Sequence, residues 1–496
     1  MYLMTKFVRL TLYTIAVLLA VVSSGAKPMA LAPRTPRLAA HTLQSDDWSL
    51  ARTVEGGFDT VVHVFAWREI EPTRGEFHWE VTDQMVAGAE YYGLDLVVRL
   101  DQQPDWAARS GAGFNAPPDD LNDYRRFVEQ VASRYQGRIK AYIIWNEPNL
   151  AVDWGGLPPD PVAYVELLKA GYEAVKGADP DALALPAGLA PTNHQSDAAL
   201  DDRLYLRRLY EAGAAPYFDV LAAHPYGFAF PPDAPATQNN GLVMGRLADL
   251  REIMVEFGDA AKPVWITEFG WTVNPPPEQP DIEVDLAQQA AYLVDALAHI
   301  EREWPWVELV TVWNISRLEA DHPFAGYSLF EANGDPRPAF TQLQTVLNRT
   351  GQPVSRLKNE DTITILSEDV VIHLGDSNLA TPWRPLFAGR YPSLVWTGGF
   401  YLNDPGRQDW VLRLEMTQQS DLGAHMSVNG VRLQPDLPQQ DFTRRWITSA
   451  RVAPANILRP GHNEITVNTV SLIPDAHHYD YVWNDFEFRH VRLARE

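Results

Sequence analysis

The chain contains no cysteine, and positive charge is scarce: 41 Lys and Arg residues stand against 64 Asp and Glu residues, for a formal net charge of -23. Without cysteine there is no disulfide framework, thiolate nucleophile, lipid-modified cysteine or cysteine-based zinc site. The acidic excess argues against nucleic acid as a partner, because binding to phosphates depends on clustered Lys and Arg. We also find no internal repeat, heptad run or low-complexity tract. These absences leave an acidic, globular, multidomain protein.

No hydrophobic run is long enough to span a membrane, and the longest apolar run lies near the N-terminus. Lys6 and Arg9 precede the apolar run Leu10–Val22, which small and polar residues follow up to Ala26. A membrane-spanning helix needs about 20 apolar residues, so this order is more typical of a secretory signal peptide. We predict a signal peptide within residues 1–32, cleaved after Ala26 or, as the alternative, after Ala32. The mature protein is expected to be secreted or extracytoplasmic, with membrane contact only if the segment stays uncleaved.

Short apolar runs alternate with helical periods between Arg37 and Asn348, which predicts parallel βα units. A helix after Asp160-Pro161 illustrates the pattern, because an N-cap and a first-turn proline precede a stripe of apolar residues. Eight strands followed by helices predict a (β/α)8 TIM barrel with its active site at the carboxyl ends of the strands. The expected strands are Leu38–Leu43, Thr60–Phe65, Leu94–Leu100, Ala141–Trp145, Ala182–Ala187, Phe218–Ala223, Val264–Thr267 and Leu309–Trp313.

The C-terminal part of the chain has a different pattern. Residues 351–362 are polar and read as a linker, and short alternating runs such as Trp410–Leu414 and Ala424–Val428 follow, with Asn429-Gly430 as a hairpin signal. We therefore predict an α/β barrel domain at 33–350 and an all-β, jelly-roll-like sandwich at 363–496.

Two glutamates end predicted strands of the barrel. Glu147 lies in Trp145-Asn146-Glu147-Pro148-Asn149, and Glu268 lies in Thr267-Glu268-Phe269-Gly270. A retaining glycosidase needs such a pair, one carboxyl group to protonate the leaving oxygen and one to attack the anomeric carbon, roughly 5 to 5.5 Å apart. Each glutamate alone is as well explained as a surface or salt-bridged residue, so the hypothesis depends on both. We expect Glu147 to be the protonated member and Glu268 the ionised one.

Further polar and aromatic residues follow the same strands. Asn146 can bond a sugar hydroxyl, His224 can bond a sugar hydroxyl or a glutamate, and the Tyr226 hydroxyl can donate to Glu268. Trp145 and Trp313 are predicted to be flat platforms for sugar rings. Trp67, Trp106, Trp154 and Trp271 also follow strands, and each is equally compatible with the core.

These motifs resemble those of glycoside hydrolase clan A, most of all family 39 and its exopolysaccharide-hydrolase and β-xylosidase relatives. The resemblance runs from Trp67-Arg68-Glu69-Ile70-Glu71-Pro72 through Trp145–Asn149 and His224-Pro225-Tyr226 to Ile266–Gly270, and it covers the barrel. It implies that Glu147 is the acid/base and Glu268 the nucleophile, and that Asn146 contacts the 2-hydroxyl of the sugar.

One position departs from the pattern of this clan. Similar barrels often carry an Arg on the second strand that supports the nucleophile, whereas this chain has His63 there. Arg99 on the third strand is a possible substitute, and a differently tuned site is the alternative.

The resulting prediction is a secreted retaining β-glycoside hydrolase that acts on a polysaccharide or oligosaccharide without a cofactor. An exo-acting β-xylosidase and a non-hydrolytic glycan-binding protein are the alternatives. We expect no metal site: His477-His478 with Asp480 and Asp485 could suggest one, but an exposed polar loop is favoured. Asn348-Arg349-Thr350 matches a glycosylation sequon by pattern only.

Overall fold

The computed structural model describes residues 35–109, 111–349, 362–366, 372–374, 395–402, 406–418, 424–437, 447–459, 461–469 and 486–495. The predicted signal peptide, nearly all of the predicted linker, and the His477–Asp485 cluster lie outside these residues. The sequon lies at the C-terminal end of helix α10, and its Thr350 is also outside them. In the described part, no helix combines the length and the apolar character that crossing a membrane requires.

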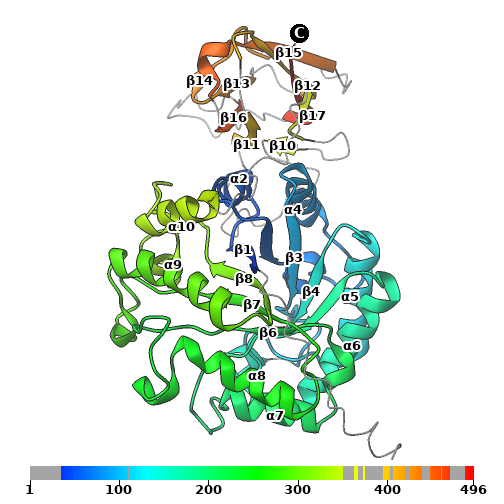
Figure 1. Ribbon diagram of the computed structural model, residues 1–496. Helices are drawn as coiled ribbons and strands as arrows, with labels where there is room; N and C mark the ends of the chain where they lie inside the picture. Colours follow the sequence, from blue (N-terminus) through cyan, green and yellow to red (C-terminus); the bar gives the residue numbers. More distant parts are fainter. Residues whose placement is uncertain are drawn as a thin grey trace, which may run out of the picture.

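The barrel predicted from the sequence is confirmed (Figure 1). Eight parallel strands form one sheet in the order β5-β4-β3-β2-β1-β8-β7-β6. The strands are β1 Arg37–Thr42, β2 Thr60–Val64, β3 Asp95–Leu100, β4 Ala141–Ile144, β5 Leu183–Pro186, β6 Leu221–Ala223, β7 Val264–Phe269 and β8 Val307–Trp313. The α-helices are α2 Asp47–Glu55, α3 Trp67–Ile70, α4 Glu80–Tyr91, α5 Leu121–Arg134, α6 Pro161–Ala178, α7 Asp202–Glu211, α8 Leu247–Glu256, α9 Leu286–Glu303 and α10 Pro338–Arg349.

A side chain completes the barrel between β5 and β6. The backbone N–H of Asp219 donates to the carbonyl of Ala184 at 2.9 Å, and the Asp219 carboxylate accepts from the N–H of Ala184 at 2.8 Å. Because the carboxylate replaces a strand carbonyl, the backbone groups of Ala184 are paired at this seam as in a regular ladder.

Helix α6 begins where the sequence predicts a cap. The Asp160 carboxylate accepts from the N–H groups of Val162 and Ala163 at the start of α6, with Pro161 in the first turn. Helix α6 packs closely on β4, because a Cβ atom on Gly171 would lie 2.9 Å from side-chain atoms of Ile144. A glycine at this position therefore lets the helix approach the strand that carries the Trp-Asn-Glu motif.

Two apolar layers hold the barrel together. The larger layer lies between the sheet and the helices, and a smaller one fills the barrel interior with residues that include Val62, Val97, Ile143 and Trp265. Successive residues of a strand face opposite sides. Arg99 therefore faces the interior, as Val97 does two residues earlier.

The C-terminal part forms two antiparallel sheets, as the sequence predicts. Asn429 and Gly430 both have positive φ and join β13 to β14 as a hairpin. This domain has its own buried core, with Tyr91 of the barrel packed against it. It also contacts the barrel at α2 (Figure 1). Its strands are β9 Thr362–Thr364, β10 Ile372–Leu374, β11 Val395–Leu402, β12 Trp410–Gln418, β13 Ala424–Val428, β14 Val431–Arg432, β15 Ile447–Ala453, β16 Gly461–Thr469 and β17 Phe486–Arg495.

Candidate active site

The backbone leaves extended geometry at the end of β4. Ile143 packs inside the barrel and Ile144 packs outside it, but Trp145 has φ 76° and Glu147 has φ 34°. Such angles are uncommon for residues other than glycine and concentrate at functional sites. Backbone hydrogen bonds hold the turn, from Trp145 N to Leu100 O and from Glu147 N to Gly188 O, both 3.2 Å long.

The prediction that Trp145 is a sugar platform is wrong. Its side chain is fully buried, with ring contacts to Tyr124 and Trp154, and its indole N–H donates to the carbonyl of Asp153 at 3.1 Å. The positive φ explains the difference, because Trp145 would face the barrel interior if the strand continued in regular alternation. Trp145 instead anchors the loop that follows.

A bulge shapes the end of β7. Ile266 pairs with Val310 and Phe269 pairs with Val312, so β7 carries one residue more than β8 between these pairs. Ile266 and Phe269 both pack in the outer layer, and the extra residue allows Glu268 to line the cavity. β-Bulges commonly re-aim a side chain beside an active site.

Glu147 and Glu268 meet in one cavity of about 1280 Å³. A carboxylate oxygen of Glu147 and one of Glu268 lie within 4.8 Å of each other. The lining also includes residues at the carboxyl ends of the strands and in the segments that follow them, among them Thr42, His63, Arg99, Phe114, Asn146, Asp153, Tyr226, Trp313, Phe324 and Tyr327.

Arg99 is the cation that contacts Glu268. Its Nη1 lies 2.7 Å from Glu268 Oε1 and 3.0 Å from Asn146 Oδ1, and its Nε lies 2.9 Å from Asp101 Oδ2. Burial acts to lower the pKa of Arg99, but the carboxylates of Asp101 and Glu268 outweigh it and raise this pKa above its ordinary value. Arg99 therefore stays charged.

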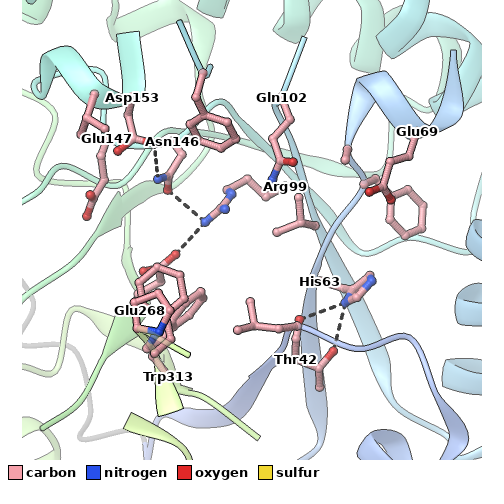
Figure 2. A pocket seen from close by; sticks show the side chains of 18 of the residues that line it. Thr42, His63, Glu69, Arg99, Gln102, Asn146, Glu147, Asp153, Glu268 and Trp313 are labelled. Atoms are coloured by element: carbon pink, nitrogen blue, oxygen red, sulfur yellow. Dashed lines mark hydrogen bonds and ion pairs between the residues drawn. The ribbon is translucent and has the colours of Figure 1, made fainter. Parts of the chain in front are cut away.

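His63 does not take the place of an arginine on β2. Its Nδ1 lies 3.0 Å from both the hydroxyl and the carbonyl oxygen of Thr42, on a different side of the cavity from Glu268 (Figure 2). Burial is the main cause that lowers the pKa of His63 to about 4. A neutral imidazole results at neutral pH, so the positive charge beside Glu268 comes from β3.

His224 and Tyr226, which follow β6, each contact one of the two glutamates. Tyr226 donates its hydroxyl to Glu268 Oε2 at 2.9 Å, and burial, followed by the charge of Glu268, raises the pKa of Tyr226 well above its ordinary value. Tyr226 is thus a proton-bearing donor. His224 Nδ1 lies 2.8 Å from Glu147 Oε1, and His224 is 3% exposed. The side chain of His224 lies beneath the cavity lining rather than in it, so its contact is to a glutamate and not to a sugar hydroxyl.

The pKa of His224 is raised above its ordinary value. Burial acts to lower the pKa of His224, but the charge of Glu268 and the hydrogen bond and charge of Glu147 together raise it above its ordinary value. His224 Nδ1 and one oxygen of each glutamate would also be close enough to share a metal ion. In the structure these atoms have protein partners instead, since Nδ1 contacts Glu147 and Glu268 accepts from Tyr226 and Arg99.

Trp313, at the end of β8, lines the cavity, with its ring in edge contact with His41 and Phe324. The other four tryptophans near strand ends differ in burial. Trp67, Trp154 and Trp271 are fully buried core residues, whereas Trp106 is partly buried and donates its indole N–H to Glu71 O at 2.9 Å.

Asp153 is a cavity carboxylate that the sequence analysis did not single out. It lies in a short 3₁₀ helix, Ala151–Trp154, and accepts hydrogen bonds from Asn146 at 3.2 Å and Asn115 at 3.3 Å. Burial, and then the charge of Glu147, raises the pKa of Asp153 to about 7. Only its position shortly after the Trp-Asn-Glu motif could have drawn attention to it.

Comparison with known proteins agrees with this geometry. Residues 119–342 match the family described as "Glycosyl hydrolase catalytic core". The chain is 24% identical over 317 residues to "Endo-1,4-beta-xylanase A" of Fusarium oxysporum f. sp. lycopersici, covering 60% of this chain and 88% of that protein. It is 24% identical over 306 residues to "Endo-1,4-beta-xylanase 1" of Gibberella zeae, covering 58% of this chain and 79% of that protein.

A solved family 39 glycoside hydrolase from the gut symbiont Bacteroides cellulosilyticus WH2 has a similar fold. Its TM-score is 0.50 at 17% identity, with 88% of this chain and 81% of that chain covered. The chain is a glycosidase whose residues 119–342 match a glycosyl hydrolase catalytic core. Its place in clan A and in family 39 is a finer assignment that we treat as a proposal.

Proposed function

We propose that the protein is a retaining β-glycoside hydrolase in which Glu147 is the acid/base and Glu268 is the nucleophile. The observation that carries the proposal is the approach of the two carboxylates within 4.8 Å at the ends of β4 and β7. Retaining enzymes hold their carboxyl groups roughly 5 to 5.5 Å apart, whereas inverting enzymes leave about 6.5 to 9.5 Å for a water molecule. The short separation favours direct attack by a carboxylate.

The surroundings of each glutamate support these roles. Arg99 and Tyr226 each donate to a different oxygen of Glu268, which holds the carboxylate in one orientation for attack on the anomeric carbon. His224 Nδ1 lies 2.8 Å from Glu147 Oε1, which holds the second carboxyl group in place. In the first step Glu147 protonates the leaving oxygen while Glu268 forms the glycosyl ester. In the second step Glu147 takes a proton from water, which hydrolyses the ester.

We propose a β-linked polysaccharide, or a long oligosaccharide, as the substrate. The cavity of about 1280 Å³ exceeds the range of roughly 300 to 1000 Å³ that encloses a small ligand. Phe114 and Phe324 line it with 48% and 43% of their surfaces exposed, and aromatic rings suit the apolar faces of sugars. The xylanases that the chain resembles make xylan the first polymer to test. We also propose export from the cytoplasm, which rests on the signal-peptide pattern of residues 1–32.

The test is release of reducing ends from xylan, other β-linked polysaccharides and aryl β-glycosides. We expect release by the wild type and by Glu252→Gln, a matched control because Glu252 is an exposed carboxylate of α8 that is not part of the cavity lining. Release should be abolished in Glu268→Gln. In Glu147→Gln it should survive only for aryl glycosides whose leaving group needs no proton. Glycan binding without release by the wild type would favour a non-hydrolytic binding protein, and release of single xylose units from chain ends would favour an exo-β-xylosidase.

A further inference from the structure

Five carboxylates line the cavity, and the proposed chemistry uses two of them, Glu147 and Glu268. Of the other three, Glu69 and Glu80 are exposed, whereas Asp153 follows the Trp-Asn-Glu motif and is partly buried. Figure 2 shows Asp153 beside Asn146, on the side of that amide opposite to Arg99. A carboxylate placed in this way can act on Asn146 through a hydrogen bond.

The protein holds Asp153 in place with several independent contacts. Its backbone carbonyl accepts from the buried indole of Trp145 at 3.1 Å, and its Oδ1 accepts from Asn115 Nδ2 at 3.3 Å. Gly155, two residues after Asp153, has φ 69°. A Cβ atom on Gly155 would lie 2.4 Å from the Cβ atom of Ala116. The two loops therefore meet at Gly155, which brings Asn115 to Asp153.

Asp153 also fixes the direction of the Asn146 amide. Arg99 can only donate hydrogen bonds, so the Asn146 atom 3.0 Å from its Nη1 is the oxygen. The Asn146 nitrogen then faces Asp153 Oδ1 at 3.2 Å. One hydrogen of this nitrogen is used by Asp153, and the second remains available to the cavity. In this orientation Asn146 presents a donor to a sugar hydroxyl.

We propose that Asp153 is a positioning residue that holds Asn146 as a hydrogen-bond donor toward the sugar. The proposal rests on the proposed function, because it assigns a role within the same site. Asp153 itself acts through Asn146 and forms no bond to the reacting atoms.

The charge of Asp153 supports this role. Its pKa is raised to about 7 by burial and by the charge of Glu147, whereas Asn146, Arg99 and Asn115 oppose the rise. In its ionised form Asp153 is a stronger acceptor for the N–H of Asn146 than a neutral oxygen.

Two substitutions separate orientation from charge. Asp153→Asn keeps an oxygen that can accept from Asn146 but removes the charge, and Asp153→Ala removes both. Loss of a hydrogen bond to a charged group predicts a fall in kcat/KM of about tenfold or more for Asp153→Ala. Asp153→Asn should lose less. Thermal unfolding of each variant is recorded alongside, and Glu252→Gln, at an exposed carboxylate of α8 outside the cavity lining, is the control.

A double-mutant cycle distinguishes positioning from general structural support. In an Asn146→Ala background, Asp153→Ala should cost less than about twofold in kcat/KM, because the residue through which it acts is already absent. An equal loss in both backgrounds would overturn the positioning role.

Crystal structures of the unliganded variants provide a test that does not depend on enzyme activity. We expect the Asn146 amide to leave its wild-type position in Asp153→Ala and to keep it in Asp153→Asn. An unmoved amide in Asp153→Ala would contradict the inference even if the substrate panel found no hydrolysis. An inactive wild type with a displaced amide would instead count against the proposed function alone.

Discussion

Replacing Arg99 by methionine should damage both stability and activity, because this one side chain neutralises two buried carboxylates. Arg99 lies 2.7 Å from Glu268 and 2.9 Å from Asp101, and all three side chains are at most 11% exposed. Methionine has a similar length but no charge and no donor. The substitution therefore leaves Asp101 and Glu268 buried without their cation.

The magnitude follows from the loss of a buried ion pair. Removing one partner of such a pair costs about 3 to 5 kcal/mol of the free energy of unfolding. At about 2 to 4 °C per kcal/mol for a domain of this order of size, Tm should fall by roughly 6 to 20 °C. Loss of a hydrogen bond to a charged group, at about 1.5 to 3 kcal/mol, should lower kcat/KM by roughly 10- to 150-fold. Thermal unfolding and initial rates, both well below Tm, measure the two effects.

Arg246→Met is the matched control. Arg246 is also buried and lies 2.6 Å from Asp202 and 3.2 Å from Asp201, but it does not line the cavity. We expect a comparable fall in Tm with kcat/KM near that of the wild type at temperatures where the variant is folded. An Arg99→Met enzyme with wild-type kcat/KM would refute the role of Arg99. A loss of the same size in both variants would refute its specificity.

Three further predictions concern other parts of the barrel. Burial lowers the pKa of His63 to about 4 in the folded protein, whereas in the unfolded chain this imidazole has its ordinary pKa of about 6.5. The contribution of His63 to stability is therefore present above about pH 6.5 and is lost as the pH falls toward 4. In denaturant titrations, His63→Asn should remove up to about 3 kcal/mol of this acid-dependent loss of stability. Trp313→Ala should raise KM roughly two- to tenfold through lost ring stacking, whereas Trp145→Phe should lower Tm and leave KM unchanged; a KM effect of Trp145→Phe alone would contradict the assignment. Gly171→Ala should destabilise by about 1 to 3 kcal/mol, whereas Gly177→Ala, with open space beside it in the same helix, should stabilise by about 0.5 to 1 kcal/mol, and equal Tm values would contradict the packing argument.

Sequence periodicity was sufficient to predict the barrel strands because each apolar run is short and ends in a polar or turn-forming segment. The boundaries differ by a few residues, as for the sixth strand, which begins at Leu221 rather than Phe218. Asp219 explains that difference, since its side chain takes over a backbone hydrogen bond at the seam. The cap at Asp160 and the hairpin at Asn429-Gly430 were predictable from local chemistry alone.

Strand periodicity alone could not predict which side chains reach the cavity. Regular alternation misplaces Trp145, because the chain turns to positive φ there, and a β7 bulge, which periodicity cannot locate, brings Glu268 into the lining. The proximity of Asp153 to Asn146 depends on a loop contact at Gly155 that no local pattern encodes. Arg99 was recognised only as one possibility, since the choice between it and His63 depends on three-dimensional distance.

The most direct test of the two-glutamate mechanism is the configuration of the first sugar released. Proton NMR spectra are recorded within minutes of adding the enzyme to a β-linked substrate that it hydrolyses. They resolve the two anomers of the product before these interconvert. Attack by Glu268 followed by attack of water predicts two inversions and hence a β-configured product. An α-configured first product would mean a single displacement by water and would contradict the account.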